Sequence, residues 1–295
     1  MRASLRLTAV FAALFTAPGC RPANLLNSLV PEDGYRVERA IAYGEGPRRK
    51  LDLYLPADVA VDGPAGRPVV VFFYGGSWQT GAREDYQFVG EALTSRGWLV
   101  VVPDYRLYPE VRYPGFVEDG ALAVAWTRRT IAAYGGDPDR IVLMGHSAGA
   151  HIAAMLAYDR AFLKAAGAPG GPAAFVGLAG PYDFLPARDP AIRAIFDVPN
   201  PAQSQPLAVA GPDAPPSLLL HGASDVTVSP GNAERLAARL EEVDVPVEHV
   251  VYPRIGHIAI VVALAAPFRW LAPVLDDVDR FLDTHMPTDV AAAGR

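Results

Sequence analysis

Short runs of apolar residues alternate along the chain with stretches in which apolar positions recur at helical spacing. The run at 68–74, PVVVFFY, is continuous, as is typical of a strand buried on both faces. Leu51, Leu53 and Leu55 recur at every second position, which is the period of a strand. The patterns predict strands at 35–43, 50–55, 68–74, 98–103, 141–145, 174–179, 217–221 and 247–252. They predict helices at 84–96, 114–134, 148–158, 231–243 and 271–284.

This order of elements favours one α/β domain over 35–285, in which a mostly parallel central sheet is flanked by helices on both faces. The strands at 35–43 and 50–55 are expected to form an antiparallel pair at its start. The helix at 114–134 is expected to bury one apolar face, made by Phe116, Leu122, Ala123 and Trp126.

The segment 183–216 is rich in proline and alanine and has little periodicity. We expect it to make an excursion over the sheet that holds at most one short helix, near 191–196. A tether is expected over 20–34 and a flexible tail over 286–295.

Composition narrows the class of protein. The chain has 295 residues, of which 51% are hydrophobic and 20% charged, so it can build a large core and is not an intrinsically disordered chain. A net charge of −6, with no basic run longer than Arg48 to Lys50, argues against a nucleic-acid partner. With Cys20 as the only cysteine, no intramolecular disulfide and no zinc cluster is expected. No oligomeric state is predicted.

The first twenty residues have the layout of an export signal. Arg2 and Arg6 precede an apolar stretch at 7–15 and small residues at 17–19. Bacterial lipoprotein signals resemble this segment and end at a cysteine that becomes lipidated, here Cys20. We therefore expect a signal peptide over 1–19 and an exported protein, periplasmic or held at the membrane only through this lipid. The alternative is an ordinary cleaved signal in which Cys20 is incidental.

The strongest chemical signal is Gly145-His146-Ser147-Ala148-Gly149, which lies between the apolar strand at 141–145 and the helix at 148–158. This is G-x-S-x-G in a strand–turn–helix context. The turn would present the Ser147 hydroxyl at the carboxyl edge of the sheet. The Ala148 N–H, at the start of the helix, could then stabilise a developing oxyanion.

A glycine pair follows the strand at 68–74, in Tyr74-Gly75-Gly76-Ser77-Trp78. Glycines there let backbone N–H groups turn toward a ligand, so Gly76 and Ser77 are candidates for the other half of an oxyanion hole. A simple tight turn is the alternative. Trp78 would border the acyl side of such a site, as a substrate-binding residue.

Two further strands end in residues that could complete a catalytic triad. Asp225 lies in the turn after 217–221 and His257 in the loop after 247–252, giving the chain order Ser147, Asp225, His257. Asp183, after the strand at 174–179, is the rival acid. Asp225 is favoured because only one helix and one strand separate it from His257.

Other polar residues near these motifs are expected to have structural or solvent roles. Asp104, Tyr105 and Arg106 follow a strand and are expected to brace loops, and Asp119 to pack its helix. The remaining histidines are His146, His151, His221, His249 and His285.

These motifs resemble those of α/β-hydrolases, and most closely the serine carboxylesterases of the hormone-sensitive-lipase-like and bacterial feruloyl- and acetyl-esterase-like groups. Those enzymes share H-G-G-[GSAY]-[WF], D-Y-R, G-x-S-A-G, G-x-x-D and G-H, in that order. The likeness spans Tyr35 to Phe281. The chain departs at Tyr74, where the family usually has His, and at Ser77, where many members have Gly. The oxyanion donors are main-chain N–H groups, so only the bracing of the loop is put in question.

The resemblance implies hydrolysis of a small-molecule ester by Ser147 as nucleophile, His257 as base and Asp225 as acid, with no metal or organic cofactor. Short acyl chains are expected because 183–216 offers no long amphipathic lid. One alternative is a peptidase or amidase on the same triad, although such relatives commonly carry a propeller or a large cap. Another is a non-catalytic exported binding protein, which should have lost a triad residue.

Overall fold

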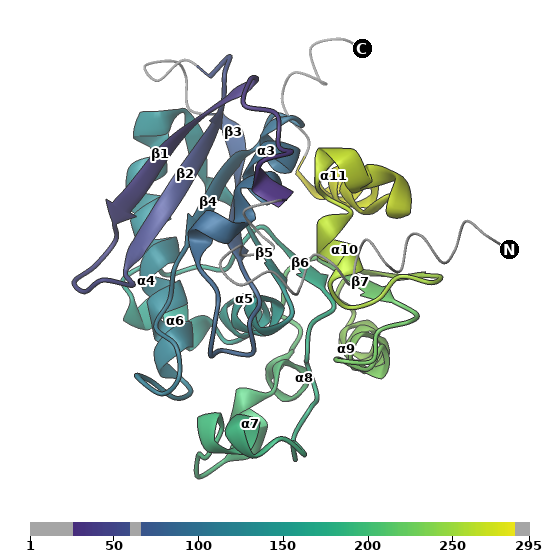
Figure 1. The fold of residues 1–295 in the computed structure, drawn as a ribbon. Helices are drawn as coiled ribbons and strands as arrows, with labels where there is room; N and C mark the ends of the chain where they lie inside the picture. The colour runs from purple at the N-terminus through teal and green to yellow at the C-terminus, as the bar shows by residue number, and fades with distance from the viewer. Residues whose placement is uncertain (1–25, 60–65, 287–295) are drawn as a thin grey trace, which may run out of the picture.

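The computed structural model describes residues 26–59 and 66–286, and its centre is a sheet of eight strands drawn from these residues (Figure 1). The strands lie in the order β1-β2-β4-β3-β5-β6-β7-β8. The pairs β1–β2 and β2–β4 are antiparallel and all other neighbours are parallel, which confirms the predicted α/β fold with a mostly parallel sheet. The bounds are β1 Tyr35–Ala42, β2 Lys50–Pro56, β3 Arg67–Phe73, β4 Leu99–Pro103, β5 Gly136–His146, β6 Ala174–Leu178, β7 Ser217–Gly222 and β8 Val247–Tyr252.

Helices of eight residues or more cover the sheet, at the places where the sequence predicts them. They are α3 (Gln87–Thr94), α4 (Gly115–Thr130), α5 (Ala148–Tyr158), α9 (Gly231–Glu242) and α11 (Val274–His285). Two of the predicted helices are longer than the α-helices that the structure contains, because part of each is a 3-10 turn. The one at 84–96 begins with a 3-10 turn, η1 (Arg83–Tyr86), and the one at 114–134 ends in another, η2 (Ile131–Tyr134).

The helices lie on both faces of the sheet, as two adjacent residues of β3 illustrate. Phe72 contacts the ring of Tyr86, just before α3, with ring centroids 5.6 Å apart. Phe73 points the other way, toward Gly120 of α4. Since successive side chains of a strand face opposite sides, α3 and α4 cover opposite faces. Arg96 pairs with carboxylates of α11, which places α11 on the side of α3.

Helix α4 buries only part of its expected face. Phe116 and Ala123 are buried, whereas Leu122 and Trp126 are only partly buried. Asp119 is not a simple packing residue either. Its carboxylate is fully buried and accepts hydrogen bonds from the guanidinium of Arg106 at 2.8 Å, a pairing that the sequence did not reveal.

The excursion over 183–216 holds more helix than expected. It contains α7 (Pro190–Ile195), a 3-10 turn η3 (Pro201–Ser204) and α8 (Pro206–Val209), so the prediction of at most one short helix was wrong. Each of these elements carries a proline in its first positions. Proline is tolerated there because the N–H that it lacks has no helical partner. Figure 1 shows α7 at the outer edge of the molecule, beyond α5.

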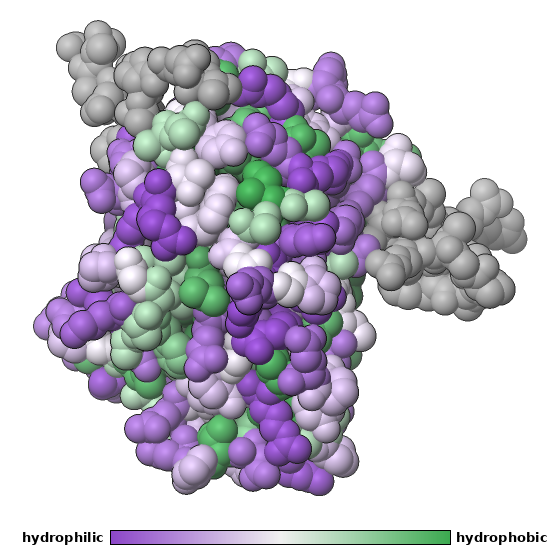
Figure 2. All heavy atoms as spheres, turned by 90° about the vertical axis from the view of Figure 1, so that its left-hand side faces the viewer, coloured by the Kyte–Doolittle hydropathy of each residue, from purple (hydrophilic) through white to green (hydrophobic). Residues whose placement is uncertain are grey.

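Three further short helical elements were not predicted. They are α6 (Arg160–Ala165), α10 (Ala259–Val262) and the 3-10 helix η4 (Ala266–Leu271). Figure 2 shows the face that lies to the left in Figure 1, where polar residues predominate and apolar residues form small areas between them.

The predicted signal peptide and Cys20 lie outside the described residues, so lipidation stays a prediction. Part of the segment expected as a tether is packed against the domain. Val30 is buried, and the Asn27 amide donates to the carbonyl of Glu84 at 2.7 Å. At the other end Met286 is buried, and the remainder of the expected tail lies outside the described residues. Within 26–59 and 66–286, no helix combines the length and hydropathy that a bilayer span requires.

Candidate active site

Ser147 stands alone in the sharp turn between β5 and α5. Its backbone has φ 55° and ψ −124°, a left-handed conformation that is strained for a residue with a Cβ. The flanking glycines make this turn possible. A Cβ on Gly145 would lie 2.4 Å from the carbonyl carbon of Gly149, and a Cβ on Gly149 would lie 2.0 Å from the carbonyl oxygen of Phe73. The strand–turn–helix context predicted for the motif is therefore present.

The structure brings Ser147, His257 and Asp225 together, although the first two are 110 positions apart. The Ser147 hydroxyl lies 2.8 Å from Nε2 of His257, and Nδ1 of His257 lies 2.8 Å from Oδ2 of Asp225. With a neutral imidazole, Ser147 donates to Nε2 and Nδ1–H donates to the carboxylate. This is the arrangement by which a histidine can remove the serine proton.

The loops that carry Asp225 and His257 are joined through their backbones. The Ser224 N–H donates to the carbonyl of Ile255 at 2.9 Å. A Cβ on Gly222, at the end of β7, would lie 2.2 Å from that same carbonyl oxygen. Glycine at 222 is therefore required for the close approach that sets the distance between the carboxylate and the imidazole.

Asp225 is held as an ionised carboxylate. Burial raises its pKa, but hydrogen bonds from His221, His257 and the Val228 N–H outweigh this and hold the pKa well below its usual range. Oδ1 accepts the N–H groups of Thr227 and Val228, each at 2.9 Å, and Oδ2 lies 3.2 Å from Nε2 of His221. The carboxylate therefore keeps its charge and its orientation at neutral pH.

The rival acid, Asp183, lies elsewhere. Its carboxylate is paired with the guanidinium of Arg235 at 2.6 Å and is partly exposed. Among the described contacts, none joins Asp183 to His257.

The loop after β3 passes directly beside Ser147. A Cβ on Gly75 would lie 3.0 Å from the Cβ of Ser147. Gly76, Ser77 and Trp78 all have positive φ, at 132°, 53° and 59°. Among the residues that the structure describes, none accepts a hydrogen bond from the N–H of Gly76, Ser77 or Ala148. These three donors are the ones that the sequence singled out.

Trp78 packs into a cluster of aromatic rings between this loop and the excursion. Only 3% of its surface is exposed. Its ring stacks on Phe184, with centroids 5.5 Å apart, and meets Phe196 and His151 edge-on at 4.8 and 5.2 Å. The N–H of His151 donates to the carbonyl of Ser147, so the cluster lies one helical turn from the nucleophile.

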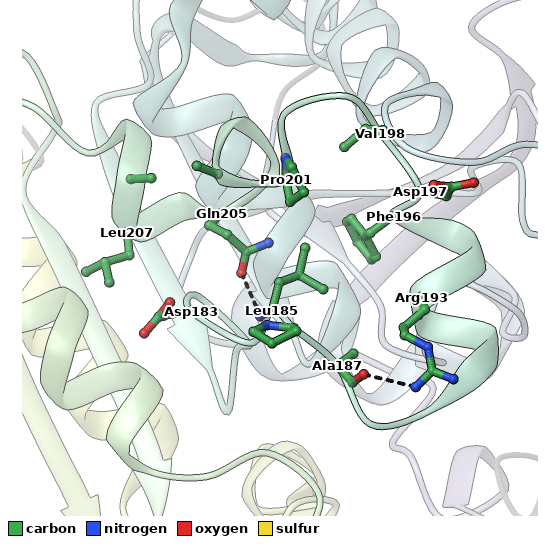
Figure 3. A pocket seen from close by; sticks show the side chains of 13 residues that line it. Asp183, Leu185, Ala187, Arg193, Phe196, Asp197, Val198, Pro201, Gln205 and Leu207 are labelled. Carbon is green, nitrogen blue, oxygen red and sulfur yellow. Dashed lines mark hydrogen bonds between the residues drawn. The ribbon is translucent and has the colours of Figure 1, made fainter.

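A cavity of about 580 Å³ lies within the excursion, and Phe196 is among the residues that line it (Figure 3). All of its lining residues fall between 183 and 208, and none of the three triad candidates borders it. Phe196 belongs both to the lining of this cavity and to the aromatic cluster around Trp78.

Two histidines that were expected to have only structural or solvent roles contact the triad candidates. His221 bonds to the carboxylate of Asp225. Nε2 of His146 lies 2.9 Å from the main-chain carbonyl oxygen of His257. Burial, aided by the nearby His257, lowers the pKa of His146 to about 3, so its ring is neutral and donates this bond. Position beside Ser147, or four residues before Asp225, is the only signal in the sequence that points to these roles.

No group of three or more histidine, cysteine or acidic side chains among the described residues is placed to hold a metal ion.

Two known families match successive segments of the chain. Residues 51–189 match the family BD-FAE, and residues 192–284 match the prolyl oligopeptidase family. The first part contains Ser147 and the second contains Asp225 and His257.

Among curated proteins, the probable isoprenylcysteine alpha-carbonyl methylesterase ICMEL1 of Arabidopsis thaliana is 32% identical over 268 residues. The match covers 81% of this chain and 55% of that protein. The chain thus spans about half the length of the curated relatives that it matches.

Solved structures show the same fold. Esterase B from Lactobacillus rhamnosis superposes with a TM-score of 0.77 at 19% identity, over 99% of each chain. The propionate-bound form of Est2 from Thermogutta terrifontis gives a TM-score of 0.67 at 25% identity, over 86% of this chain and 96% of that one.

Proposed function

We propose that this chain, which has the α/β-hydrolase fold, is a carboxylesterase and hydrolyses carboxylic esters through an acyl-enzyme formed on Ser147. The observation that carries the proposal is the hydrogen-bonded series Asp225, His257, Ser147, with both bonds at 2.8 Å. Its members come from three loops at one edge of the sheet, and the nucleophile occupies a strained turn.

In the acylation step, the Ser147 oxygen attacks the ester carbonyl carbon while Nε2 of His257 takes the hydroxyl proton. Asp225 stabilises the imidazolium that forms. Cleavage of the carbon–oxygen bond then releases the alcohol, which receives the proton from His257. A water molecule attacks the acyl-enzyme with the same base, and the carboxylic acid leaves.

The oxyanion of each tetrahedral intermediate would be held by the N–H groups of Gly76, Ser77 and Ala148. Their freedom from internal acceptors supports this role. Loss of one such donor typically costs about 2.7–4 kcal/mol of transition-state stabilisation. Because the donors belong to the backbone, Ser77 serves as well as the glycine that many relatives have.

We propose further that the acyl group is short, from acetyl to butyryl. Trp78 directly follows the proposed oxyanion donor Ser77, and its buried ring, packed against Phe184 and Phe196, would close the space beside the donors. A chain that cannot pass these rings leaves its methylenes in water, and each of them forgoes about 0.8 kcal/mol of binding. The propionate-bound relative is consistent with a site of this size.

Peptide or amide hydrolysis is the second candidate, because residues 192–284 match the prolyl oligopeptidase family. The same triad can cleave both bonds. Comparison of p-nitrophenyl acetate with a p-nitroanilide of matched acyl group separates the two. We expect kcat/KM on the ester to exceed that on the anilide by at least about 100-fold, and the reverse ranking would make the chain an amidase.

The decisive experiment combines activity with labelling. A p-nitrophenyl phosphonate should phosphonylate the wild type at Ser147, identified by peptide mass, and abolish hydrolysis of p-nitrophenyl esters. Ser147→Ala should remain folded, take no label and lose at least about 10⁴-fold in kcat. Activity that survives this substitution above about a tenth of the wild-type rate would refute the assignment, and a non-catalytic binding protein would show no label at all.

A further inference from the structure

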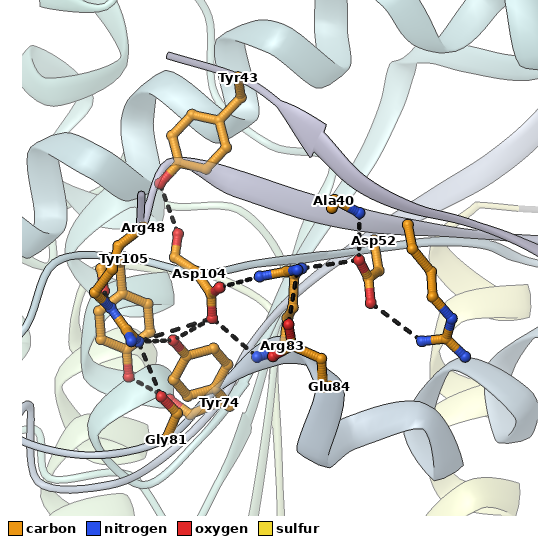
Figure 4. A network of polar contacts seen from close by, with 11 residues as sticks. Ala40, Tyr43, Arg48, Asp52, Tyr74, Gly81, Arg83, Glu84, Asp104 and Tyr105 are labelled. Carbon is orange, nitrogen blue, oxygen red and sulfur yellow. Dashed lines mark hydrogen bonds and ion pairs between the residues drawn. The ribbon is translucent and has the colours of Figure 1, made fainter. Parts of the chain in front are cut away.

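The loop at 75–81, called the oxyanion loop from here on, is held at both ends by one nitrogen atom. Nη2 of Arg48 donates to the hydroxyl of Tyr74 at 2.7 Å and to the carbonyl oxygen of Gly81 at 2.9 Å (Figure 4). Tyr74 directly precedes the loop and Gly81 ends it. Arg48 itself is fixed by a third bond, from Nε to the carbonyl of Tyr105 at 2.7 Å. The arginine therefore bridges the two ends.

Tyr74 is anchored at its hydroxyl and at its backbone. The hydroxyl donates to Oδ1 of Asp104 at 2.8 Å, and the Tyr74 carbonyl accepts from the hydroxyl of Tyr105 at 2.7 Å. Burial raises the pKa of the Tyr74 hydroxyl well above its ordinary value, so the proton stays on and the bond to Asp104 persists.

Asp104 is in turn held by a chain of buried charges. Oδ1 also accepts the backbone N–H of Arg83 at 2.9 Å, and the guanidinium of Arg83 pairs with Oδ2. Nε of Arg83 continues to Asp52 of β2 at 2.8 Å. Each carboxylate in this network faces a guanidinium, so the charges compensate one another. The network links the Tyr74 hydroxyl to β2 of the sheet (Figure 4).

The ring of Tyr74 is as constrained as its hydroxyl. It is fully buried and stacks between Tyr86 and Tyr105, with centroids 5.5 and 4.7 Å away. Gly81, with φ 111°, lies directly on this ring, because a Cβ there would come within 2.8 Å of it. The end of the oxyanion loop therefore rests on the residue that starts it.

The loop needs such support because its conformation is unfavourable on its own. Ser77 and Trp78 both carry side chains and yet adopt φ 53° and 59°. Residues in the left-handed region persist only where the surrounding structure imposes the conformation. The N–H of Gly76 is oriented by ψ of Gly75 and φ of Gly76, and the N–H of Ser77 by ψ of Gly76 and φ of Ser77, so the backbone conformation of this loop sets where both donors point.

We propose that Arg48 and Tyr74 are positioning residues that set the direction of the oxyanion donors at Gly76 and Ser77. The inference rests on the proposed ester hydrolysis. It concerns residues that touch neither substrate nor triad. Tyr74 stands where the esterases that this chain resembles usually have His, so bracing through a hydroxyl is a feature of this chain.

The test compares Tyr74→Phe with Tyr43→Phe. Tyr74→Phe removes the hydroxyl but keeps the stacked ring. Tyr43 provides the matched control, because its buried hydroxyl bonds to the same residue, Asp104, at the main-chain carbonyl and at 2.6 Å, yet does not contact the loop. We expect kcat on p-nitrophenyl acetate to fall about 10-fold to 100-fold in Tyr74→Phe, less than loss of a donor outright, with KM unchanged within about twofold. Tyr43→Phe should keep kcat within about twofold.

Affinity for a trifluoromethyl ketone, which forms a charged hemiketal oxygen on the serine, is the readout that a purely structural role would not move. Its inhibition constant should rise in Tyr74→Phe by the same factor by which kcat/KM falls. Arg48→Lys, at a partly exposed side chain, provides a second variant if Tyr74→Phe does not fold. It should weaken inhibitor affinity and lower kcat together, and the double variant should lose less than the product of the two single losses, since both substitutions remove the bond between Arg48 and Tyr74.

If the wild type is active and both variants keep wild-type kcat and inhibitor affinity, Arg48 and Tyr74 do not position the donors. They are equally excluded from that role if only KM rises, or if Tyr43→Phe loses as much kcat as Tyr74→Phe. If the wild type hydrolyses no ester and Ser147 takes no phosphonate label, the proposed function itself fails, and this proposal with it.

Discussion

The imidazole of His146 donates a hydrogen bond of 2.9 Å to the main-chain carbonyl of His257. The residue immediately before Ser147 thus holds the backbone of the proposed base, His257, and the rings of the two histidines lie 4.9 Å apart. Because the pKa of His146 is lowered to about 3, this ring is neutral throughout the range in which an esterase works. The distance between Ser147 and His257 is therefore set by the turn between β5 and α5, which carries His146, as well as by the loop after β8.

His146→Phe should lower kcat about 5-fold to 10-fold, because a neutral hydrogen bond contributes about 1 kcal/mol and its loss frees the loop of His257. His146→Gln, which keeps an amide donor, should lose less. Steady-state rates on p-nitrophenyl acetate measure both. If His146→Phe keeps the wild-type kcat, the bond has no role in placing the base.

Replacement of the two candidate acids should separate them clearly. Asp225→Asn should lower kcat/KM by about 10³–10⁴-fold, because an amide at this position favours the wrong tautomer of His257. Asp183→Asn should stay within about twofold of the wild type, since it breaks only a partly exposed pair with Arg235. The opposite ranking in kcat/KM would give the acid role to Asp183.

The fold and the grouping of Ser147, Asp225 and His257 could be predicted from the sequence for reasons that these particular residues make plain. A continuous apolar run such as 68–74 has few alternatives to a buried strand. Glycine is required at 145 and 149 because a Cβ at either position would come within 2.5 Å of backbone atoms. Ser147, Asp225 and His257 each follow a predicted strand, so a parallel sheet necessarily brings them to one edge.

Contacts between particular side chains could not be predicted from patterns of apolar residues and glycines. The contact of His146 with His257 joins residues 111 positions apart and depends on which way a ring turns. The pairing of Asp119 with Arg106 is of the same kind. The prediction for 183–216 was wrong because it treated proline as a helix breaker. Pro190 and Pro206 instead stand at the first positions of helices there.

Stability should fall in acid, and His151 should account for a measurable part of the loss. Burial lowers the pKa of His151 to about 4, from an ordinary 6.5, although its bond to the Ser204 carbonyl opposes the shift. Between these values the unfolded chain binds a proton that the folded chain does not, so the free energy of unfolding decreases as pH falls. At pH 5 the solution is about 1.5 pH units below the pKa of the unfolded histidine and still above that of the folded one. Protonation of the unfolded chain therefore lowers the free energy of unfolding by roughly 2 kcal/mol.

Urea unfolding of the wild type and of His151→Gln at pH 7, 6 and 5 measures this effect. Glutamine does not titrate, and the stability that it loses between pH 7 and pH 5 should be smaller by roughly 2 kcal/mol. His146 remains in both proteins and contributes equally to each. Parallel pH dependences would mean that His151 is protonated in the folded state well above pH 4.

Phe196 should set the length of acyl chain that the site accepts. Its buried ring lies 4.8 Å from the ring of Trp78 and also borders the 580 Å³ cavity of the excursion. Phe196→Ala would therefore open the aromatic cluster toward a space that can hold several methylenes, each contributing about 0.8 kcal/mol when buried. We expect the wild type to prefer acetyl to butyryl esters and Phe196→Ala to shift the optimum of kcat/KM to hexanoyl or octanoyl.

Leu207→Ala is the matched control, because Leu207 borders the same cavity without belonging to the ring cluster around Trp78. Enlarging the cavity without opening the wall should leave the preference for short chains unchanged. A wild type whose kcat/KM already rises to palmitoyl esters would show that the rings do not close the site. An unchanged profile in Phe196→Ala would show that the acyl chain leaves Ser147 in another direction, so that the cavity serves some purpose other than acyl binding.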